Sequence, residues 1–435
     1  MHLAQRAHLL IFLTAVLAIG GIWARDSAFA DLWRIPAAMV LIGVAVEGLL
    51  VRKLAVTADV ETAARGFLGR EQPAAFAFHN PSARALRIEY APVTPPGIEL
   101  GGGPRLTRLI AAAAGSSARD PVTLLPVSLG SKTWPVLPVR LRGALGLAWW
   151  SRGLRPSVRI AVAPDTLHAD RIRPQGVAGG MRPRRLIGAG AELHQLRRYV
   201  RGDAPARIDW KASARTRTLI TCEFSEDQHL DVLVALDAGR FSRVRSGSLD
   251  RFGQYANATA RLAELVVAND DRIGLTVFAD RPLAVCMPER GRPAVMRIRR
   301  TLEAMAVRSA ESDAVAAALR IRSMLRHRSL IVILTDVNDA QVADQAARAV
   351  RLLAPPHLVV IAGTHSREIA ELAQREAHEW IDPWVALAAE EHESRARSQR
   401  VLLRRLGAPV LAAEEEGLEQ AVLAEYARLR RSRRI

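Results

Sequence analysis

Two long apolar runs open the chain, and a short polar connector separates them. The first extends from Leu9 to Ala24 and the second from Ile35 to Val51, so each approaches the roughly 17–25 residues that a helix needs to cross a bilayer. Arg52 and Lys53 follow the second run directly. Because positive residues stay on the cytoplasmic side, residues 1–53 are predicted to form a transmembrane hairpin with both termini in the cytoplasm.

Other interpretations of these runs stay open. The first run, with Ala28-Phe29-Ala30 behind it, also has the form of a cleavable signal peptide, and both runs could instead be core helices of a soluble protein. Glu47 lies inside the second run, where an acidic residue is a functional candidate by default. Because Glu47 is about one turn from the end of the run, we expect its carboxylate to reach the membrane interface.

Short β-branched or alternating runs, separated by turn residues, follow between residues 54 and 170. Six or seven strands in such a length predict a β-rich, sandwich-like domain. The stretch from Leu106 to Ala114 is the exception, since its pattern also fits a helix. Residues 171–190 are rich in Gly, Pro and Arg and predict an extended linker.

From Asp231 onward, apolar strands alternate with helical patterns. The predicted strands are Asp231–Asp237, Ile273–Phe278, Leu283–Met287, Leu330–Leu334, Leu358–Ala362 and Ala408–Leu411. The predicted helices lie around Phe252–Val266, Val295–Ala306, Asp313–Leu325, Ala340–Leu353, Val385–Leu406 and Leu418–Arg431. This alternation predicts an α/β domain within residues 191–435, with a mostly parallel sheet and helices on both faces.

Two acidic residues, Asp237 and Asp336, each lie at the carboxyl end of an apolar strand. Ligands of parallel sheets bind at this edge, where the strand order reverses. Two carboxylates there could hold a hard cation such as Mg²⁺ if hydroxyls or waters complete the ligand shell.

The composition narrows the possible chemistry. A formal charge of +17 on 435 residues favours anionic partners, but the arginines are scattered and no aromatic run lies between them to stack on bases, so we expect no nucleic-acid partner. The two cysteines, Cys222 and Cys286, are too few for a disulfide framework or a zinc cluster.

The most distinctive segment lies between residues 196 and 215 and mixes six cations, two aspartates, a tyrosine and a tryptophan with apolar and small residues. Its groups Leu196-Arg-Arg-Tyr199, Gly202-Asp203, Arg207-Ile-Asp-Trp210 and Ser213-Ala-Arg215 resemble the signature of the bacterial family called "domain of unknown function 58". The resemblance implies a protein of the bacterial inner membrane with a domain similar to von Willebrand factor type A. It also implies association with a MoxR-type AAA+ ATPase, and it brings no established enzymatic activity.

The von Willebrand type A fold usually carries a metal loop of the form Asp-x-Ser-x-Ser. The matching residues here are Asp237, Gly239 and Phe241, so only the aspartate is kept, and Arg240 adds positive charge beside it. A metal site at Asp237 and Asp336 is therefore degenerate, and we expect Asp237 to have a structural role and the protein to need no cofactor.

Within the signature we expect Asp203 and Asp209 to pair with Arg207 or Arg215, Gly202 to supply a turn conformation that a side chain would forbid, and Trp210 to bury its ring as an anchor. The same segment could also present a cationic face to an acidic partner. The candidate signature or interaction residues are Arg197, Arg198, Tyr199, Gly202, Asp203, Arg207, Asp209, Trp210, Lys211, Ser213 and Arg215.

These features favour a membrane-anchored adaptor without enzymatic activity, which binds other proteins and works with an AAA+ ATPase. The alternatives are a metal-dependent binding module that uses Asp237 and Asp336, and a hydrolase. No sequence motif supports the hydrolase, because neither Ser213 nor Ser225 lies in the sequence context of a nucleophile elbow.

Overall fold

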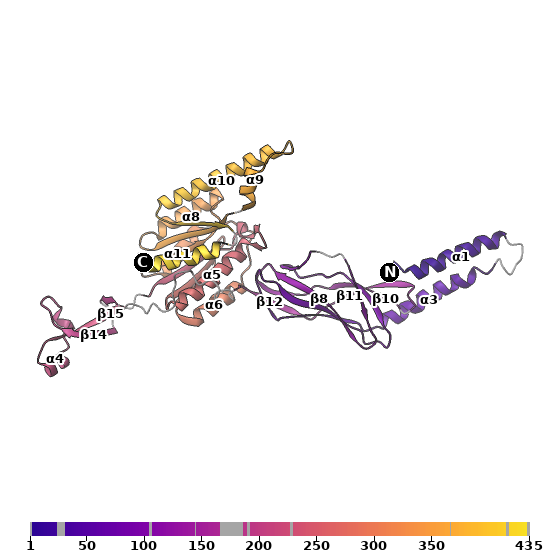
Figure 1. Cartoon of the computed structure of the whole chain (residues 1–435), viewed down its shortest axis with the longest axis horizontal. Helices are drawn as coiled ribbons and strands as arrows, with labels where there is room; N and C mark the ends of the chain where they lie inside the picture. Colours follow the sequence, from indigo (N-terminus) through magenta and orange to yellow (C-terminus); the bar gives the residue numbers. More distant parts are fainter. Residues whose placement is uncertain are drawn as a thin grey trace. The chain divides into compact units, whose positions relative to one another are not determined.

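A computed structural model of the chain describes residues 2–23, 31–103, 107–143, 145–165, 186–188, 192–226, 229–365, 367–414 and 417–432. The chain divides into two units, which are described separately (Figure 1). The first comprises Met1–Asp165, Gly247–Gly253 and Arg300–Ala306, and the second comprises Thr166–Ser246, Gln254–Arg299 and Val307–Ile435. The predicted linker over 171–190 lies outside the described residues, except for a short strand, β13 (Leu186–Gly188).

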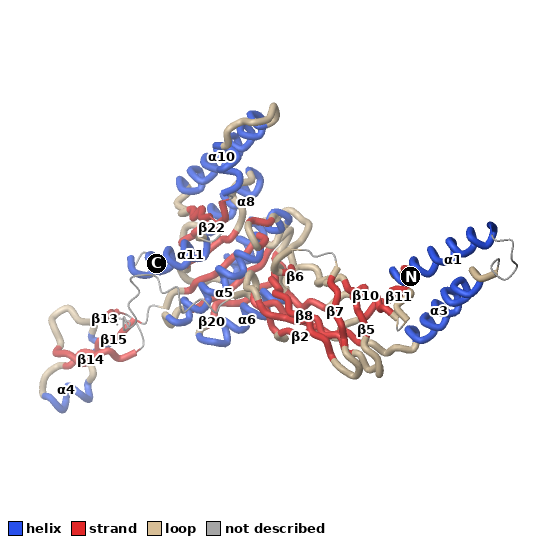
Figure 2. Tube along the Cα trace, turned by 45° about the vertical axis from the view of Figure 1, so that its right-hand side comes forward, coloured by secondary structure: helices blue, strands red, loops and turns tan. Residues whose placement is uncertain are grey.

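Two helices, α1 (Gln5–Trp23) and α3 (Arg34–Arg52), form the predicted hairpin, and both are long and apolar enough to cross a membrane. Many of their apolar side chains are exposed, among them Leu9, Phe12, Ile22, Leu41 and Ile42. Such exposure is favourable in lipid and unfavourable in water. The two helices pack against each other side by side (Figure 2).

Both ends of the hairpin are attached to the β-rich region. Strand β1 (His2–Leu3) precedes α1 and pairs antiparallel with β11 (Ala148–Leu154). Behind α3, the guanidinium of Arg152 donates hydrogen bonds to the carbonyl oxygens of Leu54, at 2.5 Å, and of Arg52, at 2.6 Å. The hairpin is therefore held to the sheet at its start and at its end.

Glu47 makes the third attachment. Its side chain is fully buried, and its two carboxylate oxygens accept hydrogen bonds from the backbone N–H groups of Gly146 (2.8 Å), Leu147 (3.1 Å) and Ala148 (3.0 Å). The loop before β11 covers this carboxylate and replaces water with three backbone donors. Gly143 belongs to the same cover: a Cβ at this position would lie 2.0 Å from Glu47 Cγ.

The β-rich region contains antiparallel sheets, as the alternating pattern predicts. One has the order β1-β11-β10-β5-β7 and the other β2-β4-β8-β6, while a smaller sheet has the order β3-β12-β9. Their strands are β2 (Thr57–Thr62), β3 (Arg65–Phe67), β4 (Gln72–His79), β5 (Leu86–Tyr90), β6 (Ile98–Leu100), β7 (Arg108–Ala112), β8 (Ser117–Pro126), β9 (Gly130–Thr133), β10 (Leu137–Arg142) and β12 (Arg159–Ala163). In the smaller sheet β12 pairs parallel with β3. The helical alternative for residues 106–114 is wrong, because β7 pairs with β5 there.

An aromatic cluster joins the two larger sheets. The rings of Phe76 and Phe78, from β4, lie 5.4 and 4.6 Å from the ring of Tyr90, from β5, and Trp134 packs edge-on against Phe76 at 6.1 Å. Such tilted and edge-on pairs contribute about 0.5–1.5 kcal/mol each beyond the area they bury. The inward positions of both sheets therefore form one core.

The second unit contains a six-stranded sheet of order β20-β19-β16-β21-β22-β23 (Figure 1). Five strands are parallel, and β20 (Pro282–Glu289) is the antiparallel edge. The others are β16 (Asp231–Asp237), β19 (Arg272–Phe278), β21 (Leu330–Leu334), β22 (Leu358–His365) and β23 (Val410–Glu414), and the helices are α5 (Arg251–Ala268), α6 (Gly291–Glu303), α7 (Ala314–Met324), α8 (Ala340–Leu353), α9 (Arg367–Gln374), α10 (Asp382–Arg405) and α11 (Leu418–Ser432).

Both faces of this sheet are buried. Leu233 and Ala235 of β16 join a core with α7 and α8, and the alternate residues Val232 and Val234 are equally buried on the opposite face, where α5 and α11 lie. Because both faces of the sheet are buried, its strands are apolar at almost every position. The predicted alternation of strands and helices is thereby confirmed as a mixed α/β region.

Replacing Glu47 with Ala leaves three buried backbone N–H groups without their acceptor. Since each unsatisfied buried donor costs about 1–3 kcal/mol, we expect Glu47→Ala to destabilise the junction by about 3 kcal/mol or more, and Glu47→Gln to have a smaller effect. Thermal unfolding of the full chain in detergent, with limited proteolysis at the loop before β11, measures this difference.

Glycine substitutions provide the matched control. Gly143→Ala should resemble Glu47→Ala, whereas Gly20→Ala in α1 should be neutral, because nothing lies within 4 Å of a Cβ there. Equal behaviour of all these variants would contradict the attachment through Glu47.

Candidate functional site

The signature residues build a small module, here named the arm (residues 192–226). Strands β14 (Glu192–Arg198) and β15 (Ile220–Glu226) pair antiparallel, and β13 completes a three-stranded sheet. Between β14 and β15 the chain forms a 3-10 turn (Pro205–Arg207) and the short helix α4 (Trp210–Thr216) (Figure 1). The signature is thus one contiguous structural element.

An ion pair closes the turn after β14. The guanidinium of Arg197 donates to both oxygens of Asp203, at 2.7 and 2.8 Å, and the backbone N–H of Val200 donates to Asp203 Oδ2 at 2.9 Å. These hydrogen bonds lower the pKa of Asp203 to about 2, and the hydrogen bond from Arg197 makes the largest contribution. Gly202 has a φ of +113°, which confirms the prediction that this turn needs a glycine.

A second set of polar contacts holds α4 to β15. Asp209 caps the helix by accepting a hydrogen bond from the backbone N–H of Ala212 at 2.9 Å. The buried hydroxyl of Ser213 donates to the carbonyl oxygen of Asp209 at 2.7 Å and accepts from the N–H of Ile220 at 2.8 Å. Ser213 therefore has a structural role.

The pairing that we expected for the two aspartates is wrong. Asp203 pairs with Arg197, because the turn at Gly202 folds it back onto the preceding strand, and Asp209 is used as a helix cap. The predicted partners Arg207 and Arg215 make no ion pair among the residues that the structure describes.

The described side chains of the arm form almost no apolar core. Among the described side chains, no hydrophobic residue between Ala163 and Val232 is buried, and the only buried residues of the arm are Ser213 and Thr221. Trp210 is 67% exposed. The prediction that Trp210 buries its ring is therefore wrong, because the described part of the arm offers no buried apolar cluster for the ring to join.

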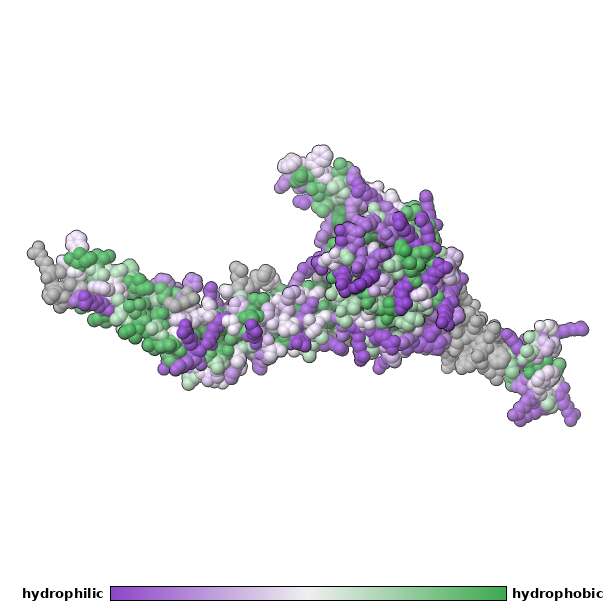
Figure 3. Space-filling view, turned by 180° about the vertical axis from the view of Figure 1, so that it is seen from behind, coloured by the Kyte–Doolittle hydropathy of each residue, from purple (hydrophilic) through white to green (hydrophobic). Residues whose placement is uncertain are grey.

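The exposed surface of the arm combines apolar and basic residues. Leu196, Val200 and Leu219 are 47%, 61% and 45% exposed. The exposed cations that make no ion pair with any described residue are Arg198, Arg201, Lys211, Arg215 and Arg217. Figure 3 shows hydrophobic residues of this module among hydrophilic ones. A surface that combines an exposed aromatic residue with exposed aliphatic and cationic side chains is typical of a protein-binding surface.

The second candidate site lies at the carboxyl edge of the six-stranded sheet. Because β19 lies on one side of β16 and β21 on the other, the strand order reverses between β16 and β21. Asp237 ends β16, and its carboxylate accepts hydrogen bonds from Gly239 N–H (2.8 Å), Ser312 Oγ (2.5 Å) and Thr335 Oγ1 (2.6 Å). Burial raises the pKa of Asp237 even though these three donors, working in the opposite direction, favour the charged form.

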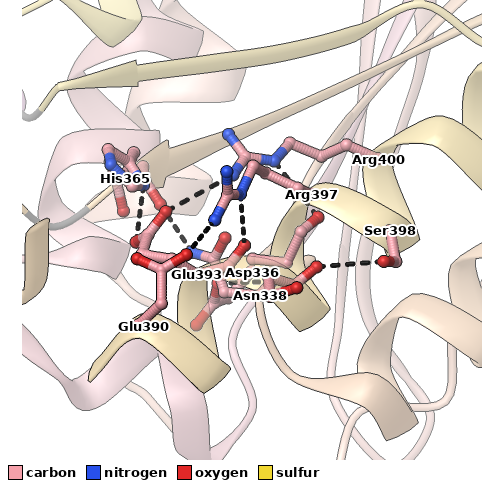
Figure 4. A network of polar contacts seen from close by, with 11 residues as sticks. Asp336, Asn338, His365, Glu390, Glu393, Arg397, Ser398 and Arg400 are labelled. Atoms are coloured by element: carbon pink, nitrogen blue, oxygen red, sulfur yellow. Dashed lines mark hydrogen bonds and ion pairs between the residues drawn. The ribbon is translucent and has the colours of Figure 1, made fainter. Parts of the chain in front are cut away.

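Asp336 lies next to this cluster and is also buried. It accepts a hydrogen bond from the backbone N–H of Asn338 at 3.0 Å. Figure 4 shows Asp336 and Asn338 beside charged residues of α10. Nearby, Glu393 lies 3.5 Å from His365 and 3.8 Å from Arg400. This edge of the sheet therefore carries both signs of charge.

The residues around Asp237 do not match the Asp-x-Ser-x-Ser metal loop that the sequence resemblance suggests for comparison. A Cβ on Gly239 would lie 2.0 Å from Ser312 Oγ, so a serine at this position would displace Ser312. Arg240 pairs with Glu311 at 3.0 Å, and within the described part of the chain no group of three or more His, Cys, Asp or Glu side chains could hold a metal ion. Asp237 and Asp336 do lie close together, but both oxygens of Asp237 already accept hydrogen bonds from protein donors.

Our reading of the sequence did not find Ser312 and Thr335. Thr335 directly follows the predicted strand Leu330–Leu334, and Ser312 directly precedes the predicted helix Asp313–Leu325, but single hydroxyl residues at such positions are too common to be selected. Their contact with Asp237 depends on the tertiary arrangement of two loops.

Residues 195–383 match the family model described as "Protein of unknown function DUF58". The matched segment begins in β14 and ends in the first turn of α10, so it includes the arm from residue 195 and most of the six-stranded sheet. A search of curated proteins found no match. The family description assigns no function, so any function of this chain is a proposal.

Several solved structures show weak similarity. The conserved hypothetical protein BatB from Bacteroides thetaiotaomicron is 12% identical, with a TM-score of 0.29, and the match covers 46% of this chain and 99% of that one. Proximal thread matrix protein 1 from the mussel byssus is also 12% identical, with a TM-score of 0.28, and 46% of each chain is covered. The CARDB domain of PF1109 from Pyrococcus furiosus is 5% identical, with a TM-score of 0.18 and coverage of 26% and 96%. TM-scores this low carry no conclusion about this chain.

Removing the charge of Asp203 should loosen the arm. The pKa of this carboxyl is lower in the folded arm, at about 2, than its ordinary value of 3.8, so its contribution to stability is present above pH 3.8 and is lost as the pH falls through about 2. We expect Asp203→Asn to lower hydrogen-exchange protection in β15 at pH 7. The difference from the unmodified chain should shrink between pH 4 and pH 2, while β19 stays unchanged in both proteins.

Adding metal ions distinguishes a structural role of Asp237 from a role as a metal ligand. Since its oxygens accept hydrogen bonds from protein donors, we expect millimolar Mg²⁺ or Mn²⁺ to leave the unfolding temperature of the full chain in detergent unchanged. A metal-dependent increase that disappears in Asp237→Ala would contradict this account and would favour a metal-dependent binding module.

Proposed function

We propose that this chain is a membrane-anchored adaptor, without enzymatic activity, that binds other proteins through the exposed face of the arm. In this proposal the hairpin α1–α3 anchors the chain in the bacterial inner membrane, and both termini and the folded regions lie in the cytoplasm. The partner is an AAA+ ATPase of the MoxR type, and the adaptor brings it to a client at the membrane for assembly or remodelling.

The arm surface is the observation that carries this proposal. A folded segment usually buries its large apolar side chains, but here Trp210 and Val200 are more than half exposed while polar groups hold the module together. Tryptophan and arginine are the residues that most often dominate binding energy at protein interfaces. The basic residues around Trp210 favour a partner with an acidic and apolar segment.

Two further features support the anchor and the choice of partner. The exposed apolar faces of α1 and α3 suit a bilayer, and Arg52 and Lys53 at the end of α3 suit its cytoplasmic side. The sequence contains no Gly-rich phosphate loop of the Walker type. A remodelling process would therefore take its energy from a separate ATPase.

The α/β region supplies the scaffold in this proposal. Its single antiparallel edge strand, β20, and the acidic residue at the end of β16, Asp237, are the features that favour a relation to the von Willebrand type A fold. Such a scaffold would support the arm without using Asp237 as a metal ligand.

Affinity capture with tagged full-length chain from detergent-solubilised membranes tests the proposal. The arm variant, defined as Lys211→Glu, Arg215→Glu and Arg217→Glu, should capture the ATPase about tenfold less than the unmodified chain, because it places acidic residues opposite an acidic partner.

The control variant makes the same charge change in the β-rich region, with Arg70→Glu, Arg84→Glu and Arg155→Glu, and should capture the ATPase normally. These three arginines are exposed and make no ion pair with described residues. The absence of any AAA+ ATPase, with or without trapped nucleotide, would reject the partner. Equal capture by both variants would reject the arm as its docking surface.

A further inference from the structure

The connection between α9 and α10 ends in a second exposed apolar surface. We name residues 367–387, which contain α9 and the start of α10, the tip (Figure 2). The first buried residue of α10 is Ala389, followed by Ala396 and Leu403 at seven-residue spacing. The first two turns of α10 therefore lack the packing that holds the rest of the helix to the domain.

The side chains in these unpacked turns are large and apolar. Trp380 is 81% exposed, Trp384 65% and Leu387 56%, and Ile381 and Val385 are each more than a third exposed. Residues three and four apart share one face of a helix, so Ile381, Trp384 and Val385 lie close together at the start of α10. Apolar surfaces of this kind on a folded domain usually bind a partner.

The tip is acidic, whereas the arm is basic. Residues 367–387 contain five acidic residues and two arginines. The arm, residues 192–226, contains seven basic and five acidic residues, and all seven basic residues lie between 197 and 217, where the only acidic residues are Asp203 and Asp209. Glu376 and Glu379 are exposed and have no ion pair among the described residues. Asp382 stays charged, because the backbone N–H groups of His378 and Glu379 donate to it and lower its pKa.

The two surfaces leave the α/β domain from opposite edges. The arm precedes Asp231, at the amino end of β16, and five residue steps from Glu226 reach at most about 18 Å. The tip begins two residues after His365, at the carboxyl end of β22, and α10, of 24 residues or about 36 Å, returns from it toward the amino edge. Complementary surfaces on opposite edges are suited to pairing between molecules.

We infer that the arm of one chain docks onto the tip of a second copy of this chain, with Trp210 and the arm cations facing Trp380, Trp384 and the acidic residues of the tip. This inference rests on the proposed function, because it uses the same arm surface and assigns it one occupant. The contact is heterologous, since each copy contributes a different surface. It also competes with the partner, so self-association and partner binding exclude each other on any one arm.

Complementation between two variants tests this contact directly. The tip variant is Glu376→Lys with Glu379→Lys, and the arm variant is the triple glutamate substitution defined above. Each is prepared as full-length chain in detergent, and its mass is measured by analytical ultracentrifugation over a range of concentrations and salt. Each variant alone should associate about tenfold more weakly than the unmodified chain or worse.

The mixture should form a one-to-one dimer, because the intact arm of the tip variant meets the intact tip of the arm variant. Raising the salt concentration should weaken this dimer. Trp380→Ser provides a second tip variant that keeps the charge, and circular dichroism confirms that each variant is folded. A control with Glu61→Lys and Glu71→Lys in the β-rich region should associate normally.

Three outcomes would overturn the inference: an unmodified chain that stays monomeric, a tip variant that associates normally, or a mixture that fails to dimerise. A fluorophore at position 387 that is quenched by spin-labelled lipid in nanodiscs, in a chain that stays monomeric, would assign the tip to a lipid surface instead. The tip variant should still capture the ATPase. Failure of the self-contact is therefore distinguishable from failure of the proposed function, in which the unmodified chain captures no ATPase.

Discussion

Among the described side chains of the arm only Ser213 and Thr221 are buried, and both are polar, so polar contacts carry much of the structure seen there. Segments this short usually need additional links besides a core. Here the links are polar: the bidentate pair between Arg197 and Asp203 fixes the turn, and Ser213 joins α4 to β15. Since these groups provide the internal contacts, Trp210 and most of the cations are left on the surface. Some signature residues therefore stabilise the arm through internal hydrogen bonds and ion pairs, and the others lie exposed on its surface.

A few polar contacts also attach the N-terminal helical hairpin to the β-rich region. One carboxylate, Glu47, binds three backbone N–H groups of the loop before β11, and strand β1 pairs with β11 itself. The hairpin and the β-rich region are therefore one structural unit. In the proposed function, this attachment holds the β-rich region at the membrane surface.

The patterns of apolar residues predict most of the architecture. The two helices of the hairpin, the β-rich region and the alternation around Leu330–Leu334 were all readable, because burial imposes a period on the sequence. The environment of single polar residues was not. The loop that covers Glu47 contains Gly146, 99 residues further along the chain, and Trp210 is exposed although its sequence context predicts a buried ring. Both environments depend on tertiary packing. Asp237 was placed correctly at the strand end, but its partners Ser312 and Thr335 come from separate loops.

The central claim is that the exposed face of the arm is a protein-binding surface. Site-specific photocrosslinking in living cells tests it most directly, with a photoreactive amino acid in place of Trp210 and, as a control, in place of Leu109, which is 63% exposed in the β-rich region. The account predicts discrete protein adducts from position 210 that disappear when Lys211, Arg215 and Arg217 are changed to glutamate, and none from position 109. Equal adduct formation at both positions, or no adduct at position 210, would contradict it.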